Sequence, residues 1–350
     1  MAIRVAPIGA ADAGSLATLA CREDVLRFGD HTSDAQQATW RSWLGSPDPN
    51  LGLTLGAFVD GQLEAALKLA PFTTRRRVHG ASVHLLASDE PRGDEALDAL
   101  LRAALDTGDR WLQVLRYELV CPVDHPRVEG LFAAHGLALE ARLRRSLRDR
   151  RGTALLDEVV LARVAHGAER EPLGSPLEIP PRASRRATVR LRPARPSDAA
   201  ALASSMSEPI VVWGTLQLPF QRIERWGERL KTRPPARTTF LIAEVSGALA
   251  GAGALTVPDE ARREHTGTIG MHVATAAQGQ GVGTQLMAAL LEDADRRGLS
   301  RVELSVYADN ERARRLYERA GFVIEGRSRR GSFRDGGYAD DLLMARVRAP

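Results

Sequence analysis

Lysine is nearly absent from this sequence: Lys68 and Lys231 are the only two among 48 lysines and arginines. The basic charge therefore comes from arginine, a bias that more often reflects a GC-rich genome than a nucleic-acid surface. The formal net charge is only +4 over 350 residues, and the arginine runs are short. Such runs are typical of solvated faces and loop ends, with a basic rim for an anionic ligand as the alternative. The composition predicts no nucleic-acid partner.

Cysteine and long apolar runs are also scarce. Cys21 and Cys121 are too few for a disulfide framework and do not have the spacing of metal ligands, so we expect a reducing cytoplasm and no metal. The first residues are interrupted by Pro7 before any apolar run develops, unlike a signal peptide. The longest apolar stretch, residues 241–257, contains Glu244 and several glycines, so the sequence predicts no membrane partner and no membrane span.

What the chain does contain is a long internal repeat. Residues 125–137 read HPRVEGLFAAHGL and residues 310–322 read NERARRLYERAGF. The alignment, at one constant offset, places Asn310 opposite His125, Tyr317 opposite Phe132 and Gly321 opposite Gly136. Solenoid repeats are about 20–50 residues long, far shorter than this spacing. A duplicated domain is therefore the simplest interpretation.

Other segments of the two halves also correspond. Each half opens with a short alternating strand, an aspartate that can cap a helix, and a helix rich in alanine and leucine. A helix bearing a tryptophan follows (Trp40 and Trp226), and then a hairpin whose turn is Asp60-Gly61 in one half and Ser246-Gly247 in the other. Each half closes on a matching strand, VVLARV and LLMARV.

A segment rich in proline, glycine and charge separates the halves. We place a domain at residues 1–164, a partly extended linker at residues 165–187 and a second domain at residues 188–350. The expected fold class is mixed α/β (α+β) in both domains. Each domain should contain a mixed, mostly antiparallel sheet flanked by helices.

A glycine-rich loop is the first candidate site. A predicted strand at residues 268–273 leads to Gln278-Gly279-Gln280-Gly281-Val282-Gly283, and a helix is expected from Thr284. Glycines between a strand and a helix let successive N–H groups point at one spot, where the helix dipole also favours an anion. The loop therefore suits a phosphate or pyrophosphate. A dinucleotide-binding Rossmann loop is disfavoured because the preceding strand follows a hairpin instead of opening a parallel βαβ unit.

Two motifs together carry a family resemblance. Gln278-x-x-Gly281-x-Gly283, followed by Asn310-x-x-Ala313-x-x-Leu316-Tyr317-x-x-x-Gly321-Phe322, resembles the acyl-CoA-binding motifs of the GNAT superfamily of N-acetyltransferases. The resemblance covers the whole C-terminal half. GTLQLP at residues 214–219 and the ending from Gly321 resemble bacterial L-amino-acid N-acetyltransferases. The same segments are shared, less closely, with enzymes that acetylate ribosomal-protein amino termini and polyamines.

The resemblance implies two tandem GNAT-like domains and acetyl-CoA as the acetyl donor. It implies cofactor binding by the following residues: Met271, His272, Val273, Gln278, Gly279, Gln280, Gly281, Val282, Gly283, Thr284, Asn310, Ala313 and Tyr317. The backbone at Met271–Val273 is expected to pair with the pantetheine arm and to stabilise the oxyanion where two strands separate. Fixed donors of this kind are normally the largest catalytic contribution.

The resemblance also assigns catalytic candidates. Tyr317 occupies the position of the family's tyrosine general acid, although a lone helix tyrosine more often only packs in a core. Ser305 stands where some family members carry a glutamate base, and Glu303 shares a strand face with it. Glu303 is either a base acting through a water or a structural carboxylate near Arg301. His272, His265 and, less so, Glu264 are the other candidates for the base.

The acceptor is expected to be a small-molecule primary amine, an amino acid first. Trp213, Thr215 and Gln217, with Pro219 and His272, are the candidate acceptor contacts, and each could instead be an ordinary loop contact. The alternatives are a protein amino terminus, a polyamine or an aminoglycoside-type amine. A polyamine pocket should show clustered acids, which are absent around residues 214–219. A non-catalytic acyl-CoA sensor or scaffold is the alternative from another class.

The first half lacks what the motifs require. An alignment on the helices places Pro91, which has no N–H, opposite Gly281, with Asp89 and Glu90 where a pyrophosphate would bind. His125 and Phe132 replace the motif asparagine and tyrosine. We expect this half to keep the fold without the site and to act as a pseudo-dimer partner within the chain. The sequence leaves open whether the chain also forms a homodimer.

Overall fold

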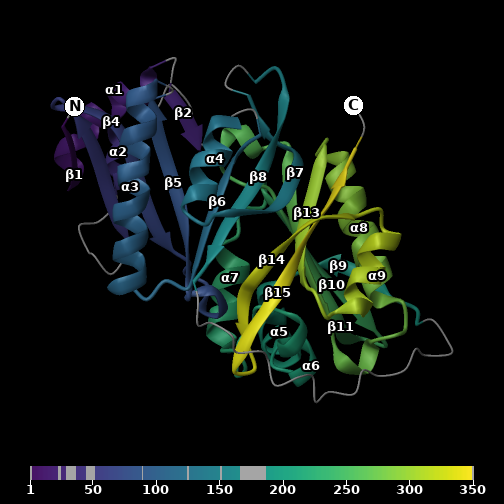
Figure 1. Ribbon diagram of the computed structural model, residues 1–350. Coiled ribbons are helices and arrows are strands. Elements are labelled where there is room, and N and C mark those ends of the chain that lie inside the picture. The colour runs from purple at the N-terminus through teal and green to yellow at the C-terminus, as the bar shows by residue number, and fades with distance from the viewer. Residues whose placement is uncertain are drawn as a thin grey trace. The chain divides into compact units, whose positions relative to one another are not determined.

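The computed structural model describes residues 2–22, 25–28, 37–44, 52–88, 90–123, 126–149, 152–165 and 187–348 (Figure 1). The chain divides into two compact units. One unit comprises Met1–Arg170 with Ser328–Phe333, and the other comprises Glu171–Arg327 with Arg334–Pro350. Residues 166–186, most of the predicted linker, lie outside the described residues.

The first unit alternates strands and helices, and the strand at Val25–Phe28 is one that the sequence analysis did not predict. Its elements are β1 (Ile3–Pro7), α1 (Ala13–Cys21), β2 (Val25–Phe28), α2 (Gln37–Leu44), β3 (Leu53–Val59), β4 (Gln62–Pro71), β5 (Gly80–Ser88), α3 (Pro91–Arg110), β6 (Arg116–Pro122), α4 (Pro126–Ala134), β7 (Ala138–Arg148) and β8 (Leu155–Val164). The strands lie in the order β1-β3-β4-β5-β6-β8-β7, and β2 also pairs with β5. Of these pairs, only β5 with β6 is parallel.

The second unit repeats this plan. Its elements are β9 (Arg190–Pro193), α5 (Ala199–Met206), α6 (Pro209–Gly214), α7 (Ile223–Thr232), β10 (Thr238–Val245), β11 (Ala248–Thr256), β12 (Thr266–Val273), α8 (Val282–Arg296), β13 (Arg301–Tyr307), α9 (Glu311–Arg319), β14 (Val323–Arg334, of which Ser328–Phe333 belong to the first unit) and β15 (Gly337–Val347). The strands lie in the order β14-β15-β13-β12-β11-β10-β9. The pair β12 and β13 is parallel, as β5 and β6 are in the first unit.

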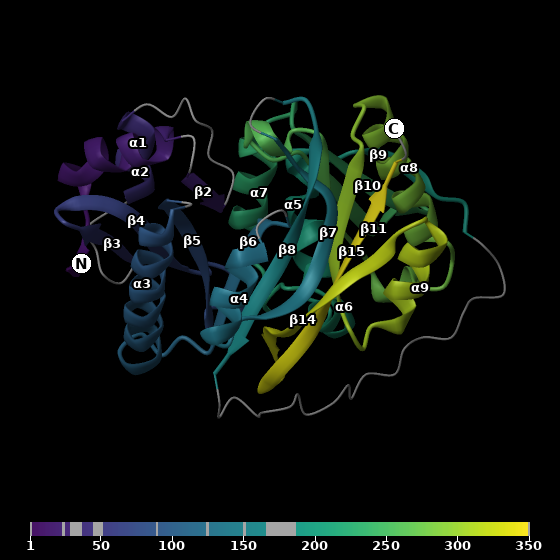
Figure 2. The same cartoon turned by 45° about the horizontal axis from the view of Figure 1, so that its top comes forward.

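Each sheet is covered by helices on both faces (Figure 1 and Figure 2). In the second unit, α5 and α7 bury Leu202 and Trp226 against one face, and α8 packs Met287 and Leu290 against the other. In the first unit, α1 and α2 form one such core around Trp40, and α3 forms the other. Alternate strand side chains enter the two cores, as the pleat of a strand requires. The predicted fold class is confirmed.

The backbone also shows the repetition. Both hairpin turns, Asp60-Gly61 and Ser246-Gly247, have positive φ at their two residues, which is the type I′ geometry that matches strand twist. Gly136 and Gly321 end α4 and α9 with φ of 78° and 89°. In each case the following residue donates its N–H to the carbonyl at the aligned ring position, Phe132 or Tyr317, at 3.0 Å. These conformations favour glycine.

Candidate active site

The two parallel strands of the second unit separate part-way along their length. Ladder pairs between the described residues of β12 and β13 run from Thr266 with Arg301 to Thr268 with Glu303, and both strands then continue. Ala274 donates its N–H to the Ala250 carbonyl at 2.9 Å. The N–H of Ala274 therefore faces β11, and the other N–H groups of β12 can be assigned from it. By antiparallel alternation, the N–H groups of Met271 and Val273 face the separating side. The N–H groups of Met271 and Val273 therefore line the opening, whereas the N–H of His272, which the sequence analysis grouped with them, faces β11.

The glycine loop fills the connection after β12. It contains a short 3₁₀ turn at Thr275–Ala277, and α8 begins at Val282, two residues earlier than predicted. Gly279 and Gly281 have φ of 81° and 89°, and no side chain caps α8 at Gly281. The first N–H groups of α8 therefore have no intrahelical acceptor and can bind an anion.

There is little room for a side chain at Gly283. A Cβ at Gly283 would stand 3.3 Å from Leu316 of α9 and 3.4 Å from Val273 of β12. The contact with the Leu316 side chain is tighter than most real Cβ contacts, so even one added carbon would require a neighbouring side chain to shift. The close approach keeps the end of β12, the start of α8 and α9 together. The residues present thus fit a pyrophosphate-bearing ligand.

Arg312 is a neighbour of this loop that the sequence analysis missed. Its guanidinium donates to the Gln278 Oε1 at 3.0 Å, and the Gln278 amide nitrogen donates to the Val273 carbonyl at 3.2 Å. Burial lowers the pKa of Arg312 from its usual value. Gln278 therefore joins α9 to β12 and holds a cation beside the glycine loop. The only signal in the sequence was the position of Arg312 inside the second motif.

The second motif forms α9 and its cap. The Asn310 Oδ1 accepts the N–H of Ala313 at 3.1 Å, which is the usual geometry of an asparagine N-cap. Tyr317 is buried beside Phe322, with ring centroids 6.1 Å apart. Burial raises the pKa of Tyr317 to about 12, so the phenol is protonated at neutral pH. Among the described residues, its hydroxyl has no recorded hydrogen-bond partner.

The opposite face of the strands carries His272, Glu303, Ser305 and Tyr307. This follows from the register, because Met271, Leu304 and Val306 enter the core beneath α8 and α9. His272 is buried and its Nε2 lies 2.8 Å from the Ser205 Oγ of α5. Burial lowers the pKa of His272 to about 4, so the imidazole is neutral at pH 7. Its Nδ1 has no partner in the described part of the chain.

Glu303 has a structural partner. The buried Arg301 contacts Glu303 at 3.0 Å and Glu325 at 2.7 Å. The first unit repeats this arrangement, with Arg116 contacting Glu118 at 3.0 Å and Glu140 at 2.7 Å. The first unit has this triad although it lacks the catalytic motif. The ion pair with Arg301 is therefore enough to explain Glu303 without a catalytic role. Ser305 is exposed, and its side chain forms no hydrogen bond among the described residues.

The predicted acceptor segment begins in a helix and not in a loop. Trp213 lies in α6, a helix that the sequence analysis did not predict, and Thr215 follows it. The Thr215 carbonyl accepts the Tyr307 hydroxyl at 3.4 Å, and its own hydroxyl donates to Val211 at 2.8 Å. The Gln217 N–H donates to the Thr215 Oγ1 at 3.3 Å. The segment is therefore attached to the end of β13, on the face that carries His272.

The corresponding region of the first unit is much shorter. β12 and α8 are joined by residues 274–281, whereas β5 and α3 are joined by residues 89–90 alone. The helix begins at Pro91, so the N-cap opposite Gly281 is Glu90, one residue away from the predicted alignment. Phe132 is fully buried in the core, and His125 lies outside the described residues.

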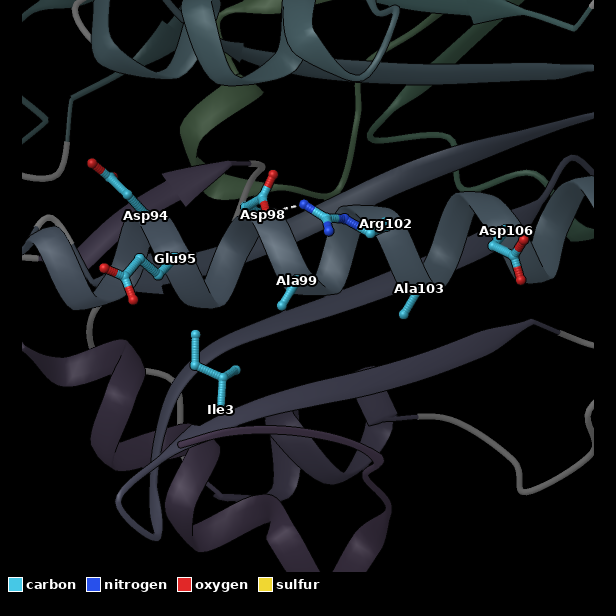
Figure 3. A pocket seen from close by; sticks show the side chains of 8 residues that line it. All are labelled: Ile3, Asp94, Glu95, Asp98, Ala99, Arg102, Ala103 and Asp106. Atoms are coloured by element: carbon cyan, nitrogen blue, oxygen red, sulfur yellow. Dashed lines mark hydrogen bonds and ion pairs between the residues drawn. The ribbon is translucent and has the colours of Figure 1, made fainter. Parts of the chain in front are cut away.

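The first unit has an open cavity of about 830 Å³ along α3. Ile3 and the side chains of α3 line it, among them Asp94, Asp98 and Asp106 (Figure 3). No residue of the predicted site lines this cavity. Within the described ranges, no group of three or more His, Cys, Asp or Glu side chains could hold a metal ion. None of the described helices is long and apolar enough to span a membrane.

Known proteins resemble mainly the second half of the chain. The model of the acetyltransferase (GNAT) family matches residues 204–322. The L-amino acid N-acetyltransferase AaaT of Escherichia coli (strain K12) is 33% identical over 159 residues, which cover 45% of this chain and 97% of that protein. A GNAT-family acetyltransferase structure from Streptococcus pneumoniae is 26% identical, with a TM-score of 0.43, and covers 46% of this chain and 100% of its own. A structure of yncA from Salmonella typhimurium with its cofactor acetyl-CoA is 18% identical, with a TM-score of 0.44, and the match covers 47% of this chain and 95% of that one.

Proposed function

Because the chain belongs to the GNAT family of acetyltransferases, we propose that it transfers the acetyl group of acetyl-CoA to the primary amine of a small molecule, an amino acid first. The observation that carries this proposal is the joint position of the glycine loop, the separated strands β12 and β13, and Tyr317 in one unit. The relative that is 33% identical is named as an L-amino acid N-acetyltransferase, which supports the choice of acceptor.

The donor site is proposed at the start of α8 and the end of β12. The N–H groups of Val282, Gly283 and Thr284, at the positive end of α8, would hold the pyrophosphate, with the turn through Gln278–Gly281 shaping the approach. Arg312 adds a positive charge nearby. The N–H groups of Met271 and Val273 would pair with the pantetheine arm. Asn310 and Ala313, which form the cap of α9, position Tyr317 in this scheme.

The acetyl thioester supplies an activated carbonyl, and the protein must handle one negative charge and one proton. In acetyl transfer the amine nitrogen forms a bond to the carbonyl carbon and the carbon–sulfur bond breaks. An N–H of β12 would stabilise the oxyanion. Because the strand already holds this donor in place, it need not reorient during the reaction. Tyr317 would give its phenolic proton to the leaving sulfur, the attacking nitrogen would lose its proton to solvent, and solvent would return a proton to Tyr317, whose raised pKa favours the phenol at neutral pH.

Removal of the amine proton depends on the class of acceptor. The α-amine of a peptide, with a pKa of about 7.7–8.0, is roughly one part in ten neutral at pH 7, whereas a lysine-like amine is roughly one part in a thousand. The α-amine of a free amino acid lies between the two, because its own carboxylate stabilises the ammonium form. His272 is neutral and faces the acceptor side, while Glu303 is already paired with Arg301. An α-amine acceptor is therefore consistent with a site that lacks an unpaired carboxylate among these candidates. Trp213, Thr215 and Gln217 are the proposed acceptor contacts.

The proposed domains are residues 1–164 and 188–350, joined by a linker at residues 165–187. The first of these domains is proposed to be non-catalytic. The two-residue connection before α3 has no room for the glycine turn that precedes α8. The core position that carries a hydroxyl in the second half is Phe132 in the first. These differences leave the second half as the place for both acetyl-CoA and the amine.

A thiol-release assay tests the proposed function. The full-length protein is supplied with acetyl-CoA and a panel of free L-amino acids, short peptides, spermidine and an aminoglycoside. We expect turnover above hydrolysis with at least one amino acid, and a kcat/KM at least tenfold above that for the other classes. A preference for peptides or polyamines would contradict the choice of acceptor. Tight binding of CoA without turnover of any amine would contradict the catalytic proposal and favour a sensor.

A further inference from the structure

A buried arginine, Arg334, lies beside the proposed acceptor segment. It is the last residue of β14 and only 2% of its side chain is exposed. Its guanidinium carbon lies 3.9 Å from the ring centroid of Trp213 and 4.3 Å from that of Tyr307. The cation is thus stacked between an aromatic ring of α6 and another at the end of β13. A guanidinium is planar and weakly hydrated, so it can occupy such a position, whereas an ammonium group cannot stack in this way.

The charge of Arg334 is balanced by one carboxylate. Its two terminal nitrogens contact the two oxygens of Asp309, one of them at 3.2 Å, and the Asp309 side chain is 55% exposed. Asp309 directly precedes Asn310, the cap of α9. The ion pair is bidentate, which fixes the orientation of the guanidinium plane as well as its position. Arg334 therefore connects the helix that carries Tyr317 with the aromatic pair.

The same side chain also holds the backbone of the acceptor segment. One terminal nitrogen of Arg334 donates to the Trp213 carbonyl at 3.4 Å, and the Tyr307 hydroxyl donates to the Thr215 carbonyl at the same distance. Between these carbonyls, a Cβ added to Gly214 would lie 3.3 Å from the side-chain amide nitrogen of Asn310. The segment from Trp213 to Thr215 therefore passes close to the side chain of the motif asparagine.

We propose that Arg334 is a positioning residue for the amine acceptor, which acts by fixing Trp213, Gly214 and Thr215 against the end of β13 and the cap of α9. This inference rests on the proposed function. Arg334 does not itself contact the reacting atoms. Its loss should loosen the acceptor segment while leaving the glycine loop at the start of α8 intact, because none of its recorded contacts reaches that loop.

The test compares Arg334→Lys with Arg327→Lys. Arg327 is on the same strand, and its Nε lies 2.6 Å from the Asp340 Oδ2, but its side chain is 62% exposed. We expect Arg334→Lys to raise the KM for the amine at least tenfold, with kcat and the KM for acetyl-CoA changed less than threefold. The Arg327→Lys control should change neither KM. Asp309→Asn, a milder change, should raise the amine KM at least threefold and serves if Arg334→Lys does not fold.

An unchanged amine KM, or an equal rise in both KM values, would overturn the proposal. Hydrogen exchange of the peptide containing residues 213–220 provides a measurement that does not need turnover. Faster exchange in the Arg334→Lys protein than in the Arg327→Lys protein supports the positioning role, and equal exchange overturns it. If the unmodified protein acetylates no amine, the proposed function fails by itself, and the exchange measurement still decides the role of Arg334.

Discussion

Tyr317 and Phe132 occupy equivalent positions in α9 and α4, and they differ by one hydroxyl. Both rings are buried, and both backbone carbonyls accept the same C-terminal hydrogen bond of their helix. The ring is thus explained by packing in both halves, but the hydroxyl is not, because no hydrogen-bond partner for it is found among the described residues. Tyr317 is 9% exposed whereas Phe132 is 0% exposed, so the residue that carries the hydroxyl is the less enclosed of the two. A polar group that packing does not explain is a reason to look for a chemical role.

We expect Tyr317→Phe to lower kcat at least tenfold, because proton transfer by a positioned acid contributes about 10²–10⁴-fold. The thermal midpoint should stay the same or rise slightly, since no hydrogen bond between described residues is lost. Steady-state kinetics with acetyl-CoA and the best amine, together with thermal unfolding, measure both effects. Tyr338→Phe in β15 is the matched control, for which kcat should not change. An unchanged kcat in Tyr317→Phe would refute the acid role.

Single residues also show where sequence reasoning is weakest. Tyr317 and the glycines were predictable because their motifs are local. Glu303 was ambiguous, because its partner Arg301 is close in sequence but Glu325, which completes the triad, belongs to another strand. Arg334 was not predicted at all, since its role depends on Trp213, Tyr307 and Asp309, which come from three other parts of the chain. Contacts between distant segments leave no pattern in a single sequence.

At the scale of elements, the glycine loop was predicted well and the small helix was not. Glycine occupies every second position of the loop, so its place between a strand and a helix is predictable from composition. α6 is only six residues long, too short for a hydrophobic period to show, so the sequence does not predict it. The separation of β12 and β13 was expected from the family resemblance alone, because strand pairing is not encoded locally.

We predict that Gly281→Ala weakens CoA binding at least tenfold, about 1.4 kcal/mol. The φ of 89° at Gly281 is unfavourable for alanine, and relaxation would turn the first N–H groups of α8 away from the ligand. Gly247→Ala is the control, because Gly247 has a φ of 81° in the turn between β10 and β11, with open space around it. Both variants should lose similar stability, but only Gly281→Ala should raise the Kd measured by calorimetry. A similar rise in the Kd for both variants would contradict the prediction.

At the scale of the whole molecule, the chain contains two copies of one fold but only one candidate site. Length and repetition predicted two domains, and the structure has two compact units with the same strand order. Most of the predicted linker, residues 166–186, lies outside the described part of the chain. Core positions survive in both halves because any stable copy of the fold needs them, whereas loop and hydroxyl positions survive only where chemistry is retained.

We therefore predict one acetyl-CoA per 350-residue chain. Calorimetry on the full-length protein should give a stoichiometry near one, because α3 follows its strand too directly to form a second glycine turn. The doubly substituted protein Gly281→Ala with Gly283→Val should show no residual binding, since the introduced side chain at residue 283 meets Leu316 and Val273. A stoichiometry of two, or residual micromolar binding in the double variant, would show that the first half also binds the donor.

The difference in length between residues 89–90 and residues 274–281 has a consequence for the history of the chain. Point substitutions can be reversed one at a time, so a half that had lost only its tyrosine could regain activity by a single change. A missing segment cannot be restored in that way, because no exchange of side chains lengthens a connection. Under the proposed function, Phe132→Tyr alone should leave the first half without acetyl transfer, because the glycine loop and the motif asparagine are missing as well.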